Sequence, residues 1–197
     1  MYTPRHRVRT KKKGPFRSIR VMAALVLVII AGLMFGYIFA AYQSLPEVGN
    51  NMRPAVSSQV FDSQGKLITT LHSDQNRLPI DINKVPKNLQ NAFIAAEDNR
   101  FYDHIGVDPI GILRAVVTNL TNRGIAQGGS TITQQLAKNA FLSQDQTLKR
   151  KIQEAILALE LERKYSKKEI LEMYMNHFYF GRGPYGIQTA AHTYFGK

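Results

Sequence analysis

A run of about 25 residues without a charge, from Val21 to Leu45, constrains this chain more than any other feature. It is rich in Val, Ile, Leu, Met, Phe and Ala, and a helix of that length crosses the hydrocarbon core of a bilayer. The run is longer than the roughly 7 to 15 apolar residues of a secretory signal peptide, and only Ala40-Ala41-Tyr42 offers a weak cleavage site. We therefore predict a retained transmembrane signal-anchor over residues 21–43, with a cleaved signal peptide as the alternative.

The charge is concentrated in front of this run. The formal net charge is +12, and the first twenty residues hold eight basic side chains and no acidic one. The remaining 18 basic and 14 acidic residues leave only +4, so nucleic acid is not favoured as a partner. By the positive-inside rule, residues 1–20 form a basic cytoplasmic tail and everything after the anchor lies outside the cell membrane. The eight residues are Arg5, Arg7, Arg9, Lys11, Lys12, Lys13, Arg17 and Arg20.

Behind the anchor, residues 44–58 contain Pro, Gly and paired Asn without a periodic apolar pattern, which predicts a juxtamembrane linker. Residues 59–197 form the predicted extracytoplasmic domain. It starts with two short strand patterns, 59–62 and 66–71, around Ser63-Gln64-Gly65, which is typical of a β-hairpin.

From Pro86 onward the pattern is helical. Pro86 and Asp108-Pro109 are start signals for two helices, and residues 147–165 show the clearest amphipathic repeat. Ser166 and Glu169 form a capping box for a last long helix. Gly181 to Gly186 predicts a tight loop that leads into a helix packed through small residues.

A cluster of polar motifs indicates a binding or catalytic site. Glu97 follows the apolar run Phe93-Ile94-Ala95-Ala96, and we expect burial beside that wall to raise its pKa and to make it a proton acceptor or donor. The stretch 127–135 places two Gly, then hydroxyl and amide side chains, at a predicted helix start, where backbone N–H groups favour anions. It lacks the Gly-Lys-[Ser/Thr] element of a Walker loop.

Three cations follow, and each has an ordinary alternative. Lys138, Arg150 and Lys151 can hold a phosphate, but Lys138 taken alone is more often a solvated surface lysine. Arg150 and Lys151 lie three or four residues from Glu154 on one helix face, so they can instead be its solvated partners. His104, followed by Gly106, more often closes a turn than performs chemistry.

With these motifs assembled, the chain resembles family-51 peptidoglycan glycosyltransferases, in particular the N-terminal part of class A penicillin-binding proteins. The family patterns are complete over residues 97–106 (Glu-Asp-x-x-Phe-x-x-His-x-Gly), 128–135 (Gly-Gly-Ser-Thr-Ile-Thr-Gln-Gln), 150–154 (Arg-Lys-x-x-Glu) and 167–176. A closing Tyr-Phe-Gly-Lys ends at Lys197, and the likeness covers roughly residues 57–197. The resemblance implies a mainly α-helical, lysozyme-like glycosyltransferase domain with a small β-hairpin at its start, whose smaller lobe lies near the bilayer.

The resemblance also implies roles for the site residues. Glu97 would be the general base for the 4-hydroxyl of the acceptor GlcNAc in lipid II, which attacks the anomeric carbon of the donor MurNAc with inversion. Lys138, Arg150 and Lys151 would stabilise the departing undecaprenyl pyrophosphate, and Glu154 would orient those cations or the donor. The expected substrate contacts are Asp98, Phe101, His104, Ser130, Thr131, Gln134, Gln135, Lys138, Arg150 and Lys151.

Cofactors and partners follow from the same likeness. No cofactor is required, but a divalent cation, Mg²⁺ or Mn²⁺, is possible near the pyrophosphate, with Asp98 as its ligand. The partners would be lipid II, the growing glycan strand, membrane lipid and proteins of cell-wall synthesis or division, and the inhibitor moenomycin would bind. We expect the domain to be incomplete at its C-terminus, without a transpeptidase domain, and its activity is therefore open.

Two other functions stay open at this point. A lytic, lysozyme-like enzyme also needs one essential Glu in a helical domain, but its Glu must act as an acid and it has little use for the cations. A non-catalytic membrane-anchored scaffold that binds cell-wall precursors is the second alternative. Dependence on a lipid-linked substrate separates the glycosyltransferase from the lytic enzyme. Loss of polymer in Glu97→Gln separates it from the scaffold.

Overall fold

The structure is a computed structural model that describes residues 15–49, 58–71, 76–122, 124, 128–143, 145–181 and 183–196. The chain divides into two compact units, Met1–Ala40 and Ala41–Lys197. The predicted basic tail up to residue 14 and the linker residues 50–57 lie outside the described residues.

The first unit holds most of one long helix, α1 (Pro15–Gln43). Its segment Ile19–Gln43 is long and apolar enough to cross a membrane, although a signal sequence meets the same criterion. Residues 19–40 are exposed on every side of the helix, and large apolar side chains such as Leu33 and Phe35 are each 71% exposed. A helix that is apolar all round is typical of a membrane span. The predicted apolar helix is confirmed, and its place in a membrane stays a prediction.

The second unit is mostly helical, as predicted, and begins with the predicted hairpin. Strands β1 (Ser58–Phe61) and β2 (Leu67–Leu71) pair antiparallel, with a register shift between Val60 and Phe61. Asp62 Oδ1 accepts the N–H groups of Gln64 and Lys66 and so closes the turn. Two further short strands, β3 (Asn76–Arg77) and β4 (Pro184–Tyr185), pair in parallel.

The helices of this unit begin where the sequence indicates. After the 3₁₀ turn η1 (Ile82–Lys84) come α2 (Lys87–Glu97), α3 (Pro109–Thr121), α4 (Ile132–Phe141), α5 (Leu148–Lys164), α6 (Lys167–His177) and α7 (Ile187–Phe195). Pro86 precedes α2, the Asp108 carboxylate accepts the Ile110 N–H, and Thr147 and Ser166 cap α5 and α6. Each cap accepts a backbone N–H group that the helix itself leaves without a partner.

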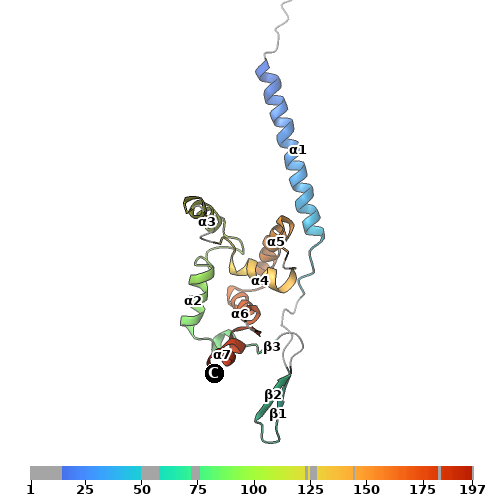
Figure 1. Cartoon of the computed structure of the whole chain (residues 1–197). Coiled ribbons are helices and arrows are strands. Elements are labelled where there is room, and N and C mark those ends of the chain that lie inside the picture. Colours follow the sequence, from blue (N-terminus) through green and yellow to red (C-terminus); the bar gives the residue numbers. More distant parts are fainter. Residues whose placement is uncertain are drawn as a thin grey trace, which may run out of the picture. The chain divides into compact units, whose positions relative to one another are not determined.

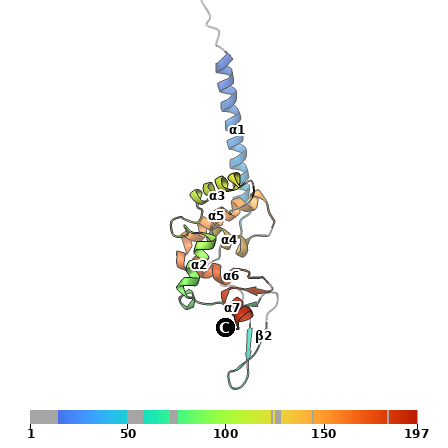
Figure 2. The same ribbon diagram turned by 60° about the vertical axis from the view of Figure 1, so that its left-hand side comes forward.

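Helix α4 lies between α5 and α6 in both views of the molecule (Figures 1 and 2). Its apolar face packs on theirs, and most of the largest buried side chains belong to these three helices. Burial of these side chains is the main stabilising term of the unit. Among them are Ile132, Leu136, Leu157, Leu161, Ile170, Leu171 and Met175.

The first residues after the anchor helix are not a free linker. Gln153 of α5 donates to the backbone oxygen and hydroxyl of Ser44, and Lys164 donates to the Val48 carbonyl. Val48 is 5% exposed and belongs to the core. Residues 44–49 of the predicted juxtamembrane linker thus form no helix or strand and pack on α5, whose polar side chains bind their backbone, and the linker stays a prediction.

The predicted tight, glycine-rich loop before α7 is confirmed, and its role is to shape the fold. Gly186 has φ +83°, and a Cβ there would approach the Asn176 carbonyl oxygen to 2.9 Å. Only glycine adopts this conformation and allows this close approach without strain. Ala190, on the buried face of α7, is 5% exposed.

Candidate active site

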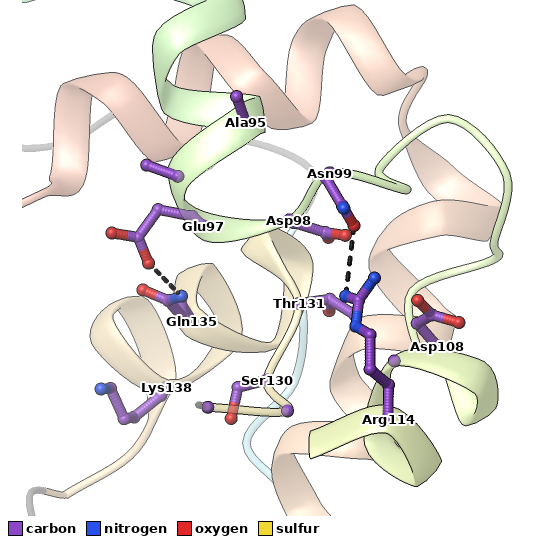
Figure 3. Close-up of a pocket in the computed structure, with 14 residues that line it drawn as sticks. Ala95, Glu97, Asp98, Asn99, Asp108, Arg114, Ser130, Thr131, Gln135 and Lys138 are labelled. Carbon is purple, nitrogen blue, oxygen red and sulfur yellow. Dashed lines mark hydrogen bonds between the residues drawn. The ribbon is translucent and has the colours of Figure 1, made fainter. Parts of the chain in front are cut away.

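Half of the predicted site residues line one pocket of about 450 Å³, which is within the size range of small-molecule sites. Figure 3 shows its walls: the end of α2 with the loop that follows, one side of α3, the glycine-rich segment 128–131, and α4. The lining residues are Ala95, Ala96, Glu97, Asp98, Asn99, Asp108, Gly111, Arg114, Gly128, Gly129, Ser130, Thr131, Gln135 and Lys138. The sequence motifs around Glu97 and Ser130, more than thirty positions apart, therefore meet in space.

Glu97 is the last residue of α2, and its carboxylate lies on the pocket wall. The Gln135 amide nitrogen donates to its Oε2 at 2.8 Å, across the gap between α2 and α4 (Figure 3). The predicted burial of Glu97 is wrong, because the residue is exposed. The apolar residues one turn before it, Phe93 and Ile94, pack against the core, whereas Glu97 is the last residue of α2 and its side chain stands at the exposed end of the helix. An accessible carboxylate held by one N–H donor is suited to accept a proton.

Asp98 supports the site from behind. Its Oδ2 is 2.9 Å from His104 Nε2 and accepts the Ile132 N–H at the start of α4 at 3.1 Å. The Gly106 N–H donates to His104 Nδ1, so Nδ1 carries no proton and Nε2–H donates to Asp98. Asp98 and His104 are each 8% exposed. The pair fixes the loop after Glu97 onto α4, and the structure gives no support for His104 as a direct substrate contact.

Thr131 and Gln134 form the capping box that starts α4. The Thr131 hydroxyl accepts the Gln134 N–H, and Gln134 Oε1 accepts the Thr131 N–H. Thr131 Oγ1 also donates to the Gly106 carbonyl at 2.6 Å, and a Cβ on Gly106 would approach the Ala158 carbonyl oxygen to 2.8 Å. Thr131 borders the pocket, whereas Gln134, 3% exposed, does not. The predicted substrate contact of Gln134 therefore has no support, because its amide is used within the helix start.

Phe101 is completely buried and does not line the pocket. Its ring contacts His104 at 6.4 Å between centroids, and the Lys167 ammonium lies 4.6 Å above it. Its predicted role as a substrate contact is not supported, since the ring fills the core beneath the loop that carries Asp98 and His104.

The three charged residues of α5 form one group. Glu154 is 1% exposed, and its two oxygens lie 2.9 Å from Arg150 Nε and 2.7 Å from Lys151 Nζ. This confirms that the three side chains share one side of the helix. The alternative of a solvated pair is wrong for Glu154, since burial makes both cations necessary partners of its carboxylate. Lys151, with its side chain 45% exposed, also donates to Ser130 Oγ at 2.6 Å, at the edge of the pocket.

Two cations face the pocket from opposite walls, Lys138 on α4 and Arg114 on α3 (Figure 3). Neither forms an ion pair with a carboxylate in the described part of the chain. The Arg114 guanidinium donates to Asn99 Oδ1 at 3.2 Å and keeps its other N–H groups for a ligand. Sequence reasoning missed Arg114 and Asn99, because nothing in the local pattern of α3 distinguishes Arg114 from a surface arginine.

Asp108, on the same wall, is already engaged. Its Oδ2 pairs with Arg100 at 3.1 Å and its Oδ1 accepts the Ile110 N–H. Burial opposes ionisation, but hydrogen bonds from the Gly111 and Ile110 N–H groups and the Arg100 charge hold the pKa of Asp108 below its ordinary value. It is a stable anion that fixes the start of α3.

The residues do not fit the Mg²⁺ or Mn²⁺ site expected at Asp98. The buried Asp98 oxygen already accepts two N–H donors, and no group of three His, Cys, Asp or Glu side chains with metal-binding geometry occurs among the described residues. Metal ions of this class prefer several oxygen ligands.

The sequence of the second unit matches the family model described as "Transglycosylase" over residues 64–197, about two thirds of the chain. The chain belongs to the transglycosylase family. It is 44% identical over 175 residues to penicillin-binding protein 1A of Aquifex aeolicus, and 44% identical over 187 residues to penicillin-binding protein 1F of Bacillus subtilis. These matches cover 88% and 95% of the chain. Penicillin-binding protein 1A of Escherichia coli is 41% identical over 179 residues, or 90% of the chain.

The chain spans about a quarter of the length of these curated relatives, with 24%, 26% and 21% of each covered. Family membership and the mainly helical domain expected from the motifs are thus confirmed. What the longer relatives do as whole proteins is a separate question.

Proposed function

We propose that this transglycosylase-family domain is a peptidoglycan glycosyltransferase that polymerises lipid II into glycan strands. One observation carries the proposal: an exposed carboxylate, Glu97, is fixed by Gln135 in a pocket that also presents Lys138 and Arg114, which form no ion pair within the described part of the chain. Such a site can take a proton from a hydroxyl and hold a phosphate in the same reaction.

In the proposed reaction, Glu97 removes the proton of the acceptor's 4-hydroxyl while the oxygen forms a bond to the anomeric carbon of the donor. The bond between that carbon and the pyrophosphate oxygen breaks on the opposite face, so the configuration inverts. The proton stays on Glu97, and the electron pair leaves with undecaprenyl pyrophosphate. The atoms and electrons of this step balance without an oxidant and without a metal.

Negative charge grows on the leaving group, and the cations act there. Lys138 lines the pocket, and Lys151 reaches its edge beside Ser130. Arg150 and Lys151 are oriented by the buried Glu154 carboxylate, so little reorganisation is needed when charge develops. Arg114, on the other wall, is a further candidate for binding an oxyanion of either substrate.

The state of Glu97 argues against the lytic alternative. A lysozyme-like acid needs an apolar pocket that keeps its carboxyl protonated, whereas Glu97 is exposed and receives an N–H donor. A hydrogen bond to the charged form favours a base.

We also propose a membrane location, with α1 as a single-pass anchor, the N-terminus in the cytoplasm and the second unit outside. The length and composition of α1 support it. A second support is the exposed apolar side of α3, where Ile110, Leu113, Val117 and Leu120 are 52 to 74% exposed. An apolar surface of this kind suits contact with lipid, the medium in which lipid II is presented.

The test is conversion of labelled lipid II to glycan by the chain in liposomes, with donor binding measured separately. Glu97→Gln should abolish polymer and leave binding largely intact, because the change removes the base and keeps the shape. Binding without polymer, unaffected by Glu97→Gln, would favour the scaffold, and cleavage of finished glycan would favour the lytic enzyme.

A further inference from the structure

A buried tyrosine that the proposed reaction does not use lies directly behind Glu97. The Tyr174 hydroxyl, on α6, is 3.1 Å from Gln135 Oε1, and the other end of that amide is 2.8 Å from Glu97 Oε2. Tyr174 is 1% exposed and does not line the pocket. Three side chains from three helices thus form one continuous chain of hydrogen bonds.

The chemistry of these groups fixes the direction of both bonds. A carboxylate only accepts, so Gln135 must turn its N–H toward Glu97 and its oxygen toward Tyr174, whose hydroxyl then donates. Burial, with the nearby Glu97 charge, raises the pKa of Tyr174, so that the hydroxyl keeps its proton. Without that donor, the bond to Glu97 alone would orient the Gln135 amide among the described residues.

Packing holds the tyrosine at this point. Its ring meets the Phe93 ring edge-on at 6.2 Å and the Phe178 ring at 5.4 Å. Phe93 lies on α2, four residues before Glu97, so Tyr174 touches the helix that carries the base as well as the amide that binds it.

We propose that Tyr174 is a positioning residue for the Glu97 base: its hydroxyl locks the Gln135 amide with the N–H group toward the carboxylate. This deepens the proposed function and rests on it, because Glu97 is the base only if the chain is a glycosyltransferase. The hydrogen-bonded arrangement can be tested without that assumption.

Removal of the hydroxyl should make ionisation of Glu97 less favourable. Once the hydroxyl is gone, the amide can turn its oxygen toward a protonated Glu97 and accept the carboxyl O–H, which favours the neutral form over the carboxylate. The other charged groups around Glu97 are Lys138 from α4, Arg114 from α3, and Asp98 and Asp108 from the loops on either side. Tyr174→Phe changes none of them.

The first experiment is a carboxyl-carbon NMR titration of the chain in detergent micelles, with the Glu97 signal assigned by its loss in Glu97→Gln. In Tyr174→Phe, which keeps the ring and its packing, the Glu97 midpoint should rise by about half to one pH unit, the size expected for one reoriented hydrogen bond to a carboxylate. Tyr165→Phe is the matched control, because it removes a tyrosine hydroxyl that binds the Gly49 carbonyl, remote from the pocket. An unchanged midpoint in Tyr174→Phe would overturn the proposal.

A double-mutant cycle separates positioning from packing. Once Gln135→Leu has removed the amide, adding Tyr174→Phe should shift the Glu97 midpoint no further, since the hydroxyl acts only through Gln135. An equal shift with and without Gln135 would mean that Tyr174 acts through the fold, and would refute the proposal.

Lipid II polymerisation completes the test. Tyr174→Phe should lower kcat about three- to tenfold on the acidic side of the pH profile, because the acidic limb of that profile moves to higher pH. The KM for lipid II should stay unchanged. If the unmodified chain makes no polymer, the proposed function fails, whereas the titration still decides whether Tyr174 orients Gln135.

Discussion

At the scale of single residues, Asp98 shows how a motif residue beside the site can act through structure. Its buried carboxylate joins His104 to the first N–H group of α4. Asp98→Ala would leave two buried donors without partners, and we expect the free energy of unfolding to fall by about 3 kcal/mol. Denaturant unfolding measures this, with the exposed Asp103→Ala as control. Equal stabilities of the two variants would show that Asp98 is not the link we describe.

Lys138 makes the opposite case, a residue whose ammonium has no ion-pair partner among the described residues. Because its ammonium lines the pocket without an ion pair, Lys138→Ala should leave stability unchanged. The substitution should weaken the binding of a phosphoglycolipid such as moenomycin about tenfold or more in Kd, which is the effect of one lost contact to a charged group. Titration of labelled inhibitor gives the affinity, and the exposed Lys149→Ala is the matched control. The same affinity in both variants would remove Lys138 from the phosphate site.

At the scale of elements, the predictable features were those fixed within a few residues. The starts of α3, α5 and α6 follow from Asp108-Pro109, Thr147 and Ser166, because a cap and its N–H partner lie within one turn, and the start of α2 follows from the fixed backbone of Pro86. The exposure of Glu97 was mispredicted, since it depends on how far the end of α2 extends beyond the core.

The two capping boxes allow a direct comparison between elements. Thr131 at α4 and Ser166 at α6 make the same reciprocal bonds, but Thr131 is 2% exposed and also binds the Gly106 carbonyl, whereas Ser166 is exposed. We expect Ser166→Ala to cost about 1 kcal/mol and Thr131→Ala about 2 kcal/mol or more. Unfolding curves of both variants under identical conditions provide the comparison, and a larger loss for Ser166→Ala would contradict the role of the buried contact.

At the scale of the whole molecule, the site depends on contacts that no local pattern encodes. Glu97 and Gln135 are 38 positions apart, Tyr174 and Gln135 are 39 apart, and Lys151 and Ser130 are 21 apart. The motifs identified which segments matter, through their likeness to a family. Only the packing of α4 against its neighbours determines that Gln135 faces Glu97, that Gln134 does not, and that Arg114 closes the far wall.

The anchor and the exposed side of α3 lead to the last prediction, on membrane binding. The second unit alone, residues 41–197, should still float with lipid vesicles if the apolar side chains of α3 enter the bilayer surface. Leu113→Glu with Leu120→Glu should abolish that flotation, because a charge in hydrocarbon is strongly disfavoured, whereas Ile68→Glu on β2, a residue 64% exposed, should not. Circular dichroism confirms that each variant is folded before it is scored. Flotation that survives the double substitution would show that another part of residues 41–197 binds the lipid, and would contradict the membrane role of the α3 surface.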